Sequence, residues 1–509
     1  MKLMKRILAI VCTFVMIISM ATGVNAVETT ATTSTPEKGR ITVKEAIAGE
    51  DYKIYKILTL ESYDKEKGFY SYKRPGGDWD TFIDSNKGHE FFNINGNGYV
   101  TLTIDSEQEA RKLAIYAIGY ARKHNVLPTR TKTASVSKGT ETTVEFDDLD
   151  LGYYVIESTS GTACAITTTN PDATVVNKHS NPYVQKKITG GGTVNTAGTQ
   201  NSVNLGDFVK FQTTIYVKPG AKKYVLHDTM DSNLQFIHIQ EVQGNGPAKT
   251  LRGPTTTSDE ADYVFKPDGV HKVDSPTDGC TFELSFTDAF YAKYQQAIDQ
   301  NELTEIHVTY IAQVKDTAQI KKRMKNTTYL SYGDHSESEK SETTTYTYGI
   351  PVFKYTGINT PLAGAKFILS TNEQPGPDNA IKFKPNGPLY RYSVDQTKGT
   401  TTLESYGEGK DKGRVDIQGL QEGIYYLKET EAPKGYNKIQ KSIKIQILSD
   451  GSIKVNDDAI TGDVNVQNNT GSILPSTGGM GTTLIYVVGS ILVLASGMVL
   501  FSKRKEGTN

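Results

Sequence analysis

Cysteine is scarce in this chain, with three residues among 509, and tryptophan occurs only once. Cys12 lies in an apolar segment near the N-terminus, while Cys164 and Cys280 fall in regions that we expect to form separate domains. We therefore expect no disulfide framework. The eight histidines do not show the spacing of metal ligands, so the sequence predicts neither a metal site nor a cofactor.

The chain also has no large excess of positive or negative charge. The formal net charge is −1 at pH 7, which offers no electrostatic basis for binding nucleic acid. The sequence has no nucleophile elbow, metalloprotease motif or phosphate-binding loop, and this argues against an enzyme. Tyrosine, by contrast, is abundant with 29 residues, and threonine and valine recur throughout, as is typical of β-strands.

The N-terminus has the pattern of a secretory signal peptide. Lys2, Lys5 and Arg6 precede an apolar stretch over residues 7–20, and small residues lead to Ala26. We expect residues 1–26 to be removed on export. The apolar stretch is short for the alternative, a permanent N-terminal membrane anchor.

The C-terminus predicts a membrane segment. Residues 484–501 are apolar and uncharged, and as a helix they extend about 27 Å, enough to cross a thin bilayer. A basic cluster at 503–505 follows, and it should stay on the cytoplasmic side. A short motif lies before this segment and consists of Leu474, Pro475, Ser476, Thr477 and Gly478. One interpretation of this motif is an ordinary Pro-Gly loop before a permanent membrane anchor.

The chain between these ends is too long for one ordinary core and suits about three domains. Short strand-like segments with Gly-rich turns predict a mainly β fold of three tandem immunoglobulin-like sandwiches, elongated, with a short helix over 105–125 in the first. A second helix is expected over 285–301. The polar segment 336–345 is expected to be a solvated connection, with an edge strand as the alternative. The expected boundaries are 1–26, 27–181, 182–348, 349–470 and 471–509.

Strand parity places three polar residues of the third domain on apolar faces. Residues two apart on a strand share a face, and Lys354, Glu429 and Asn468 each follow this spacing from apolar neighbours. Alone, each would be costly to bury. Together they suit an internal amide bond, in which the neutral Lys354 amine attacks the Asn468 side-chain carbonyl and Glu429 moves protons while ammonia leaves. Solvated or salt-bridged side chains are the alternative.

The second domain shows the same parity with a different acid. Lys186 shares a face with apolar neighbours, whereas Lys187 should point to solvent. Asp228 and Asn326 likewise lie on apolar faces of their segments. The first domain shows no comparable set of lysine, acid and asparagine.

These motifs resemble known families. The stretches "VFKYTGINTPLAGAKFIL", "YYLKETEAPKGYN" and "VQNNTG" are similar to the B-type (CnaB) module of collagen-binding proteins, in which a lysine, a glutamate and an asparagine occupy these places. The second domain resembles the related CnaA module, which implies a Lys186–Asn326 bond assisted by Asp228. The first domain, with "DLDLGYYVIES", resembles the N-terminal domain of backbone pilins.

The C-terminal motif resembles the LPXTG cell-wall sorting signal of Gram-positive surface proteins. This implies cleavage by a sortase between Thr477 and Gly478 and transfer of the Thr477 carbonyl to an amine. In backbone pilins the receiving lysine lies near the end of the first domain, where Lys178 stands in "ATVVNKHSNP". Asn177 and His179 depart from the family's Tyr-Pro-Lys-Asn pattern, and Lys186 and Lys187 lie close by.

The resemblance as a whole implies the major shaft subunit of a sortase-assembled pilus, a secreted structural protein anchored at the cell wall that supports adhesion. Its only chemistry of its own would be one-time isopeptide formation. The implied partners are a pilus-specific sortase, identical subunits in a covalent homopolymer, and peptidoglycan; tip and base pilins and a host surface ligand are further candidates. The alternative is a monomeric wall-anchored adhesin that binds a host matrix protein and needs no acceptor lysine.

Overall fold

The computed structural model describes most of the chain. The signal peptide, Lys178 and the motif at 474–478 lie outside the described residues. The described ranges are 38–64, 69–136, 142–161, 163–167, 172–176, 181–254, 261–267, 275–276, 278–471 and 481–505.

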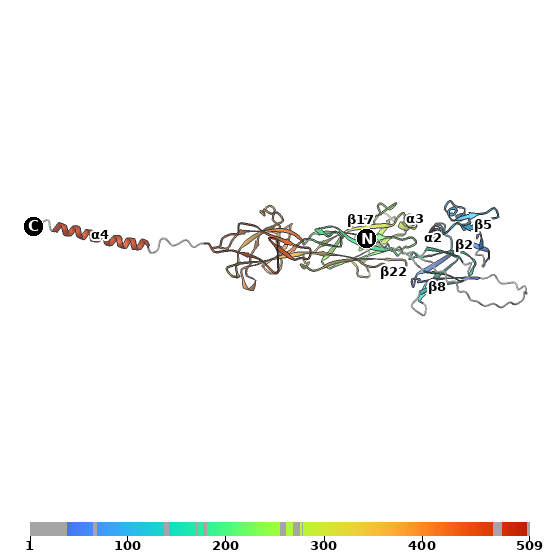
Figure 1. The fold of residues 1–509 in the computed structure, drawn as a ribbon, viewed down its shortest axis with the longest axis horizontal. Helices are drawn as coiled ribbons and strands as arrows, with labels where there is room; N and C mark the ends of the chain where they lie inside the picture. Colours follow the sequence, from blue (N-terminus) through green and yellow to red (C-terminus); the bar gives the residue numbers. More distant parts are fainter. Residues whose placement is uncertain are drawn as a thin grey trace, which may run out of the picture.

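The described chain is mainly β, as predicted, and its strands form three pairs of sheets in a row (Figure 1). We call these the first, second and third sheet pairs, over residues 38–176, 183–346 and 348–467. Each encloses buried apolar side chains, in two clusters within the first pair and one each within the second and third.

The first sheet pair combines a four-stranded sheet, in the order β11-β1-β8-β7, with a seven-stranded sheet in the order β10-β9-β2-β3-β5-β4, where β6 pairs with β2. Its elements are β1 (Lys38–Lys44), β2 (Asp51–Asp64), β3 (Phe69–Lys73), α1 (Asp78–Ile83), a 3-10 turn (Gly88–Glu90), β4 (Phe92–Ile94), β5 (Tyr99–Leu102), α2 (Glu107–Lys123), β6 (Arg130–Thr133), β7 (Ser135–Val136), β8 (Thr142–Asp150), β9 (Gly152–Ser158), β10 (Ala163–Thr167) and β11 (Asp172–Val176).

The second sheet pair combines a four-stranded sheet, β12-β15-β20-β17, with an eight-stranded sheet, β13-β14-β23-β21-β16-β19-β18, where β22 pairs with β21. Its elements are β12 (Tyr183–Gly190), β13 (Thr193–Val194), β14 (Gln200–Ser202), β15 (Phe208–Tyr216), β16 (Val225–Met230), β17 (Leu234–Gly244), β18 (Tyr263–Lys266), β19 (Phe282–Phe286), α3 (Asp288–Asp299), β20 (Glu305–Val314), β21 (Met324–Tyr332), β22 (Ser336–Glu337) and β23 (Ser341–Tyr346).

The third sheet pair combines two six-stranded sheets, β25-β24-β30-β28-β27 with β35 beside β24, and β29-β26-β31-β32-β33-β34. Its elements are β24 (Tyr348–Thr356), β25 (Thr360–Pro361), β26 (Lys366–Ser370), β27 (Phe383–Pro385), β28 (Arg391–Val394), β29 (Leu403–Glu404), a 3-10 turn (Gly409–Asp411), β30 (Arg414–Leu420), β31 (Gly423–Glu431), β32 (Ile443–Ile447), β33 (Ile453–Val455), β34 (Asp458–Ile460) and β35 (Val464–Gln467).

Both expected helices are present. Helix α2 begins after Ser106, whose side chain accepts a hydrogen bond from the Glu109 N–H and so caps the first turn. Its apolar stripe, which includes Leu113 and Ala117, is buried against the first sheet pair. Thr287 caps α3 in the same way. The short helix α1 was not predicted from the sequence.

The prediction that 336–345 is a solvated connection is wrong. The segment contains β22 and most of β23, and β23 lies inside the eight-stranded sheet between β14 and β21. Its threonines alternate, so that Thr343 and Thr345 are buried while Thr344 is only half-buried. A threonine methyl group packs against a core although the residue counts as polar, and this hides such a strand from a polarity criterion.

A polar joint connects the first and second sheet pairs. The Arg122 guanidinium, on α2, donates to Glu157 of β9 and to Asp299 of α3, each at 3.1 Å. The Glu50 carboxylate, fully buried, accepts hydrogen bonds from the backbone N–H groups of Asp334 at 2.8 Å and of the following residue at 3.1 Å. The turn between β21 and β22 is therefore held by a side chain from the first pair.

The second and third sheet pairs are nearly continuous. Strand β23 ends at Tyr346 and β24 begins at Tyr348, so only the buried Thr347 separates them. Beside this crossing, the Leu205 N–H donates to the Gly419 carbonyl at 3.1 Å. Gly419 has a φ of +82°, and a Cβ there would meet the Leu205 side chain at 2.5 Å, so the close approach requires glycine.

Helix α4 (Gly481–Lys505) is separate from the sheets (Figure 1). Its segment Leu484–Phe501 has a mean hydropathy of 2.4 and no side chains buried against the rest of the described chain. By length and composition it is able to cross a membrane.

Candidate functional site: two buried lysine clusters

The third sheet pair positions Lys354, Glu429 and Asn468 in its core. Strand β24 pairs in parallel with β35, with Lys354 opposite Val466, so the lysine lies beside the end of the last strand. Glu429 projects from β31 in the facing sheet. The three residues are 0%, 2% and 1% exposed. Strand alternation thus places all three on the inner faces that parity predicted.

The three side chains touch one another. The Lys354 Nζ contacts the Asn468 Oδ1 and lies 3.0 Å from the Glu429 Oε1. The Asn468 Nδ2 donates to the same Glu429 oxygen at 2.9 Å. The other Glu429 oxygen accepts from the Ile439 N–H at 2.7 Å, which fixes the carboxyl group. One carboxyl oxygen therefore contacts both the amine and the amide nitrogen.

The second sheet pair builds a similar cluster from three strands. Lys186 comes from β12 in the four-stranded sheet, and Asp228 and Asn326 come from the neighbouring strands β16 and β21 of the facing sheet. Their exposures are 1%, 0% and 0%. Lys187, one residue along β12, is exposed, as parity predicted.

The Lys186 Nζ lies 2.7 Å from the Asn326 Oδ1 and contacts the Asp228 Oδ2. A fourth residue completes this cluster: the buried Tyr310 hydroxyl donates to the same Asp228 oxygen at 2.5 Å and accepts from the Asn326 Nδ2 at 3.3 Å. Tyr310 thus connects acid and amide, a link that Glu429 makes directly in the third pair.

Burial sets the protonation of these groups. Loss of solvation lowers the pKa of Lys186 to about 8 and lowers the pKa of Lys354 from its usual value. The same cause raises the pKa of the Asp228 carboxyl and raises that of the Tyr310 hydroxyl well above its usual range. In the second sheet pair, these shifts favour a neutral amine beside a protonated acid.

Sequence reasoning missed Tyr310. The signal was present, because Tyr310 shares parity on β20 with Ile306, Val308 and Ala312, which are all buried. A tyrosine on a core face needs a partner for its hydroxyl. Within the described residues of the first sheet pair, the buried charged side chains are Glu50 and Glu157, and none is a lysine.

Comparisons with known proteins find similarity both in sequence and in structure. Residues 352–460 match the SpaA prealbumin-like fold domain. No curated protein sequence matches the chain. Over most of its length the structure is similar to solved Gram-positive backbone pilins. The full-length pilus protein RrgB of Streptococcus pneumoniae has 14% identity and a TM-score of 0.44, over 87% of this chain and 100% of that one.

Two further solved structures are similar. The full-length major pilin SpaD of Corynebacterium diphtheriae has 18% identity and a TM-score of 0.41, over 85% of this chain and 98% of that one. The T6 backbone pilin of serotype M6 Streptococcus pyogenes has 17% identity and a TM-score of 0.40, over 81% and 80%.

Proposed function

We propose that this chain is the shaft subunit of a covalently polymerised surface pilus, stabilised by two amide bonds that it forms itself, Lys186–Asn326 and Lys354–Asn468. The observation that carries the proposal is the repeated cluster of buried amine, carboxyl and carboxamide in two separate sheet pairs. Such a costly arrangement has no role in simple packing. It is explained if the lysine amine is converted into an uncharged amide.

In the third sheet pair, the neutral Lys354 Nζ attacks the Asn468 Cγ and forms the new C–N bond. The attacking nitrogen gives a proton to the Glu429 Oε1, which the structure places 3.0 Å away. The same oxygen returns a proton to the Asn468 Nδ2, 2.9 Å away, and the Cγ–Nδ2 bond breaks with release of ammonia. The product is an uncharged amide that leaves no lysine charge in the core.

In the second sheet pair the proton route is one residue longer. Asp228 takes the proton from the Lys186 amine, and Tyr310 hands its hydroxyl proton to the Asn326 Nδ2 while receiving another from Asp228. As in the third sheet pair, the new C–N bond replaces the broken one and one ammonia molecule is released. Asp228 and Glu429 therefore have the same role, but Tyr310 serves only one of the sites.

Assembly into a fibre would join the C-terminal end of one mature subunit to a lysine near the end of the first domain of the next. We infer that a pilus-specific sortase breaks the Thr477–Gly478 bond, holds the Thr477 carbonyl as a thioester and transfers it to the Lys178 amine of another copy. Helix α4 would hold the unprocessed subunit in the membrane until this step, since its span Leu484–Phe501 is uncharged and has a mean hydropathy of 2.4. Identical subunits, peptidoglycan and any tip or base pilin would be the covalent partners.

The test is an immunoblot of boiled cell-wall extracts from the native host, comparing wild type with Lys178→Ala. Lys187→Ala is the matched control, because Lys187 is an exposed lysine nearby. We expect a ladder of very large species that collapses to monomer in Lys178→Ala and persists in the control. A ladder in both variants moves the acceptor lysine elsewhere. A single monomer band in well-expressed wild type contradicts the shaft proposal and favours the anchored adhesin.

A further inference from the structure

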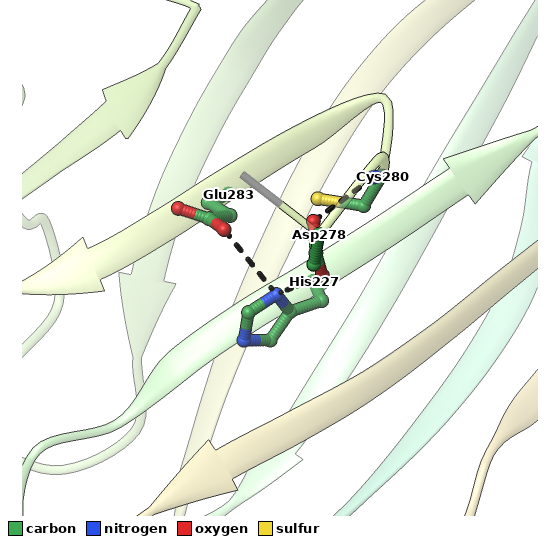
Figure 2. A group of neighbouring side chains, drawn as sticks. All are labelled: His227, Asp278, Cys280 and Glu283. Atoms are coloured by element: carbon green, nitrogen blue, oxygen red, sulfur yellow. Dashed lines mark hydrogen bonds and ion pairs between the residues drawn. The ribbon is translucent and has the colours of Figure 1, made fainter. Parts of the chain in front are cut away.

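Four side chains with metal-binding atoms meet on the outer face of the eight-stranded sheet, away from the amide clusters. His227 on β16 and Glu283 on β19 lie directly opposite each other in the strand register. Asp278 and Cys280 belong to the turn that leads into β19 (Figure 2). One ligand atom from each, the His Nδ1, the Cys Sγ and two carboxylate oxygens, all lie within 4.8 Å of one another.

The separations between these ligand atoms suit a small cation if the side chains shift slightly. The His227 Nδ1 lies 2.9 Å from an Asp278 oxygen and 3.7 Å from a Glu283 oxygen. Around a tetrahedral zinc ion with bonds of about 2.0 to 2.3 Å, neighbouring ligand atoms are roughly 3.5 Å apart. Side-chain shifts of an ångström or less therefore suffice, and the backbone register already supplies the geometry.

The histidine ring is held with one nitrogen facing the cluster. Its Nε2 is paired with the Ser331 Oγ at 3.0 Å, and the ring stacks on Tyr329 with centroids 4.5 Å apart. The Tyr329 hydroxyl donates to Asp278 at 3.0 Å. The Nδ1 atom is shielded from solvent and, among the described residues, forms no hydrogen bond of good geometry. Outer partners of this kind orient the ligands of metal sites.

Charge and exposure also suit a cation. The cluster has two carboxyl groups and a thiol that a bound metal ion would deprotonate, and the Lys266 Nζ lies 3.9 Å from the far oxygen of Glu283. The side chains of His227 and Glu283 are 12% exposed, whereas that of Asp278 is 30% exposed. The site is therefore closed below by the sheet and open to solvent on the side of the turn.

We propose that His227, Asp278, Cys280 and Glu283 bind one Zn²⁺ ion. An imidazole, a thiolate and two carboxylates match this metal, whereas Ca²⁺ and Mg²⁺ prefer oxygen ligands alone. Sequence spacing predicted no metal because His227 is distant in the chain from the other three. The ion would tie the turn before β19 to β16, one residue from Asp228, and this inference does not depend on polymerisation.

The experiment uses the full chain, purified in detergent under reducing conditions and stripped of metal. Zn²⁺ stoichiometry and affinity are measured by calorimetric titration, and Co²⁺ is added as a spectroscopic probe. We expect one Zn²⁺ per chain and a thiolate-to-cobalt charge-transfer band. Cys280→Ser should abolish the band and weaken Zn²⁺ binding by about 100-fold or more, and His227→Gln should weaken it similarly.

The control is His238→Gln, which removes an exposed histidine of β17 and should change neither measurement. Circular dichroism shows whether each variant is folded. If either Cys280→Ser or His227→Gln does not fold, the test rests on the other variant. The proposal is overturned if no cobalt–thiolate band forms, or if the folded Cys280→Ser and His227→Gln variants bind Zn²⁺ as tightly as wild type.

Discussion

The replacement Glu429→Gln removes the carboxyl group from the third sheet pair while keeping the shape of the side chain. If Glu429 moves the protons, Lys354 and Asn468 remain unreacted although they still touch. Intact mass of the mature chain then shows the loss of one ammonia molecule, from the Lys186–Asn326 bond, in place of two in wild type.

The expected change in stability follows from the length of the loop that the bond closes. Lys354 and Asn468 are 114 residues apart. By analogy with a disulfide, closing such a loop restricts the unfolded chain by about 5 kcal/mol, if chain entropy is the main term. For a unit of about 120 residues, whose melting entropy is roughly 0.25 kcal/mol/K, this corresponds to a melting temperature about 20 °C lower.

Calorimetry measures the shift, and two further variants separate its causes. Lys354→Met also prevents the bond but leaves no amine in the core, so its transition should lie at or above that of Glu429→Gln. Glu431→Gln is the matched control: Glu431 lies two residues along β31, its side chain is 62% exposed, and it pairs with Lys366 at the surface. We expect two ammonia losses and a change below about 1 kcal/mol there.

Two results would refute this reasoning. Loss of both ammonia molecules from Glu429→Gln would show that the carboxyl group is not required. A lost bond with an unchanged melting transition would show that loop closure does not stabilise this sheet pair. If the wild-type mass shows no ammonia loss, both amide bonds are absent.

Further predictions concern the second sheet pair and the joint. Lys186→Ala should lose one ammonia molecule and Lys187→Ala two, because Lys186 lies on the buried face of β12 and Lys187 does not. If both variants lose the same number of ammonia molecules by intact mass, the parity argument is contradicted. Tyr310→Phe should slow formation of the Lys186–Asn326 bond by roughly 10²-fold or more. Bond formation is measured by intact mass at intervals after cell-free synthesis, and completion at the first interval would exclude Tyr310 from the proton route. Arg122→Met removes the guanidinium that pairs with two carboxyl groups of low exposure. It should lower the free energy of unfolding by about 3 kcal/mol in denaturant titration, compared with the exposed control Lys123→Met; equal stabilities would contradict the joint.

Alternation along strands was the most informative property of the sequence. It predicted which side of β12, β24 and β31 is buried, because a residue's face on a strand depends only on its parity. It also predicted that Lys186 and Lys354 face inward, and the structure places both in the core. Whether amide bonds form there stays a prediction.

What sequence alone did not reveal depends on contacts between distant segments. Tyr310 contacts Asp228 and Asn326 only because β20 faces β16 and β21 across the core. His227 and the three residues around it gather only because β16 pairs with β19. Strand β23 was missed because its buried residues are threonines. Strand order and register, which create these contacts, are not encoded in any single segment.

The short crossing from β23 to β24 has a mechanical consequence. If subunits are joined from Thr477 to Lys178 and both proposed amide bonds form, the covalent path of a pull runs through three stretches of chain, 178–186, 326–354 and 468–477, and crosses between them through the two amide bonds. The first sheet pair and the loops 187–325 and 355–467 lie outside this covalent path. The absence of a buried lysine among the described residues of the first pair then has no mechanical cost.

Among the described residues of that route, the hairpin of β21 and β23 can lengthen. Asn326 lies opposite Thr343 in the β21–β23 ladder, so a pull opens this hairpin from its free end, one hydrogen-bonded pair at a time. Its full release adds 17 residues, or roughly 60 Å per subunit. Glu50 of the first sheet pair holds the turn at the far end of the same hairpin. Through this contact the first pair would resist the last step of the extension.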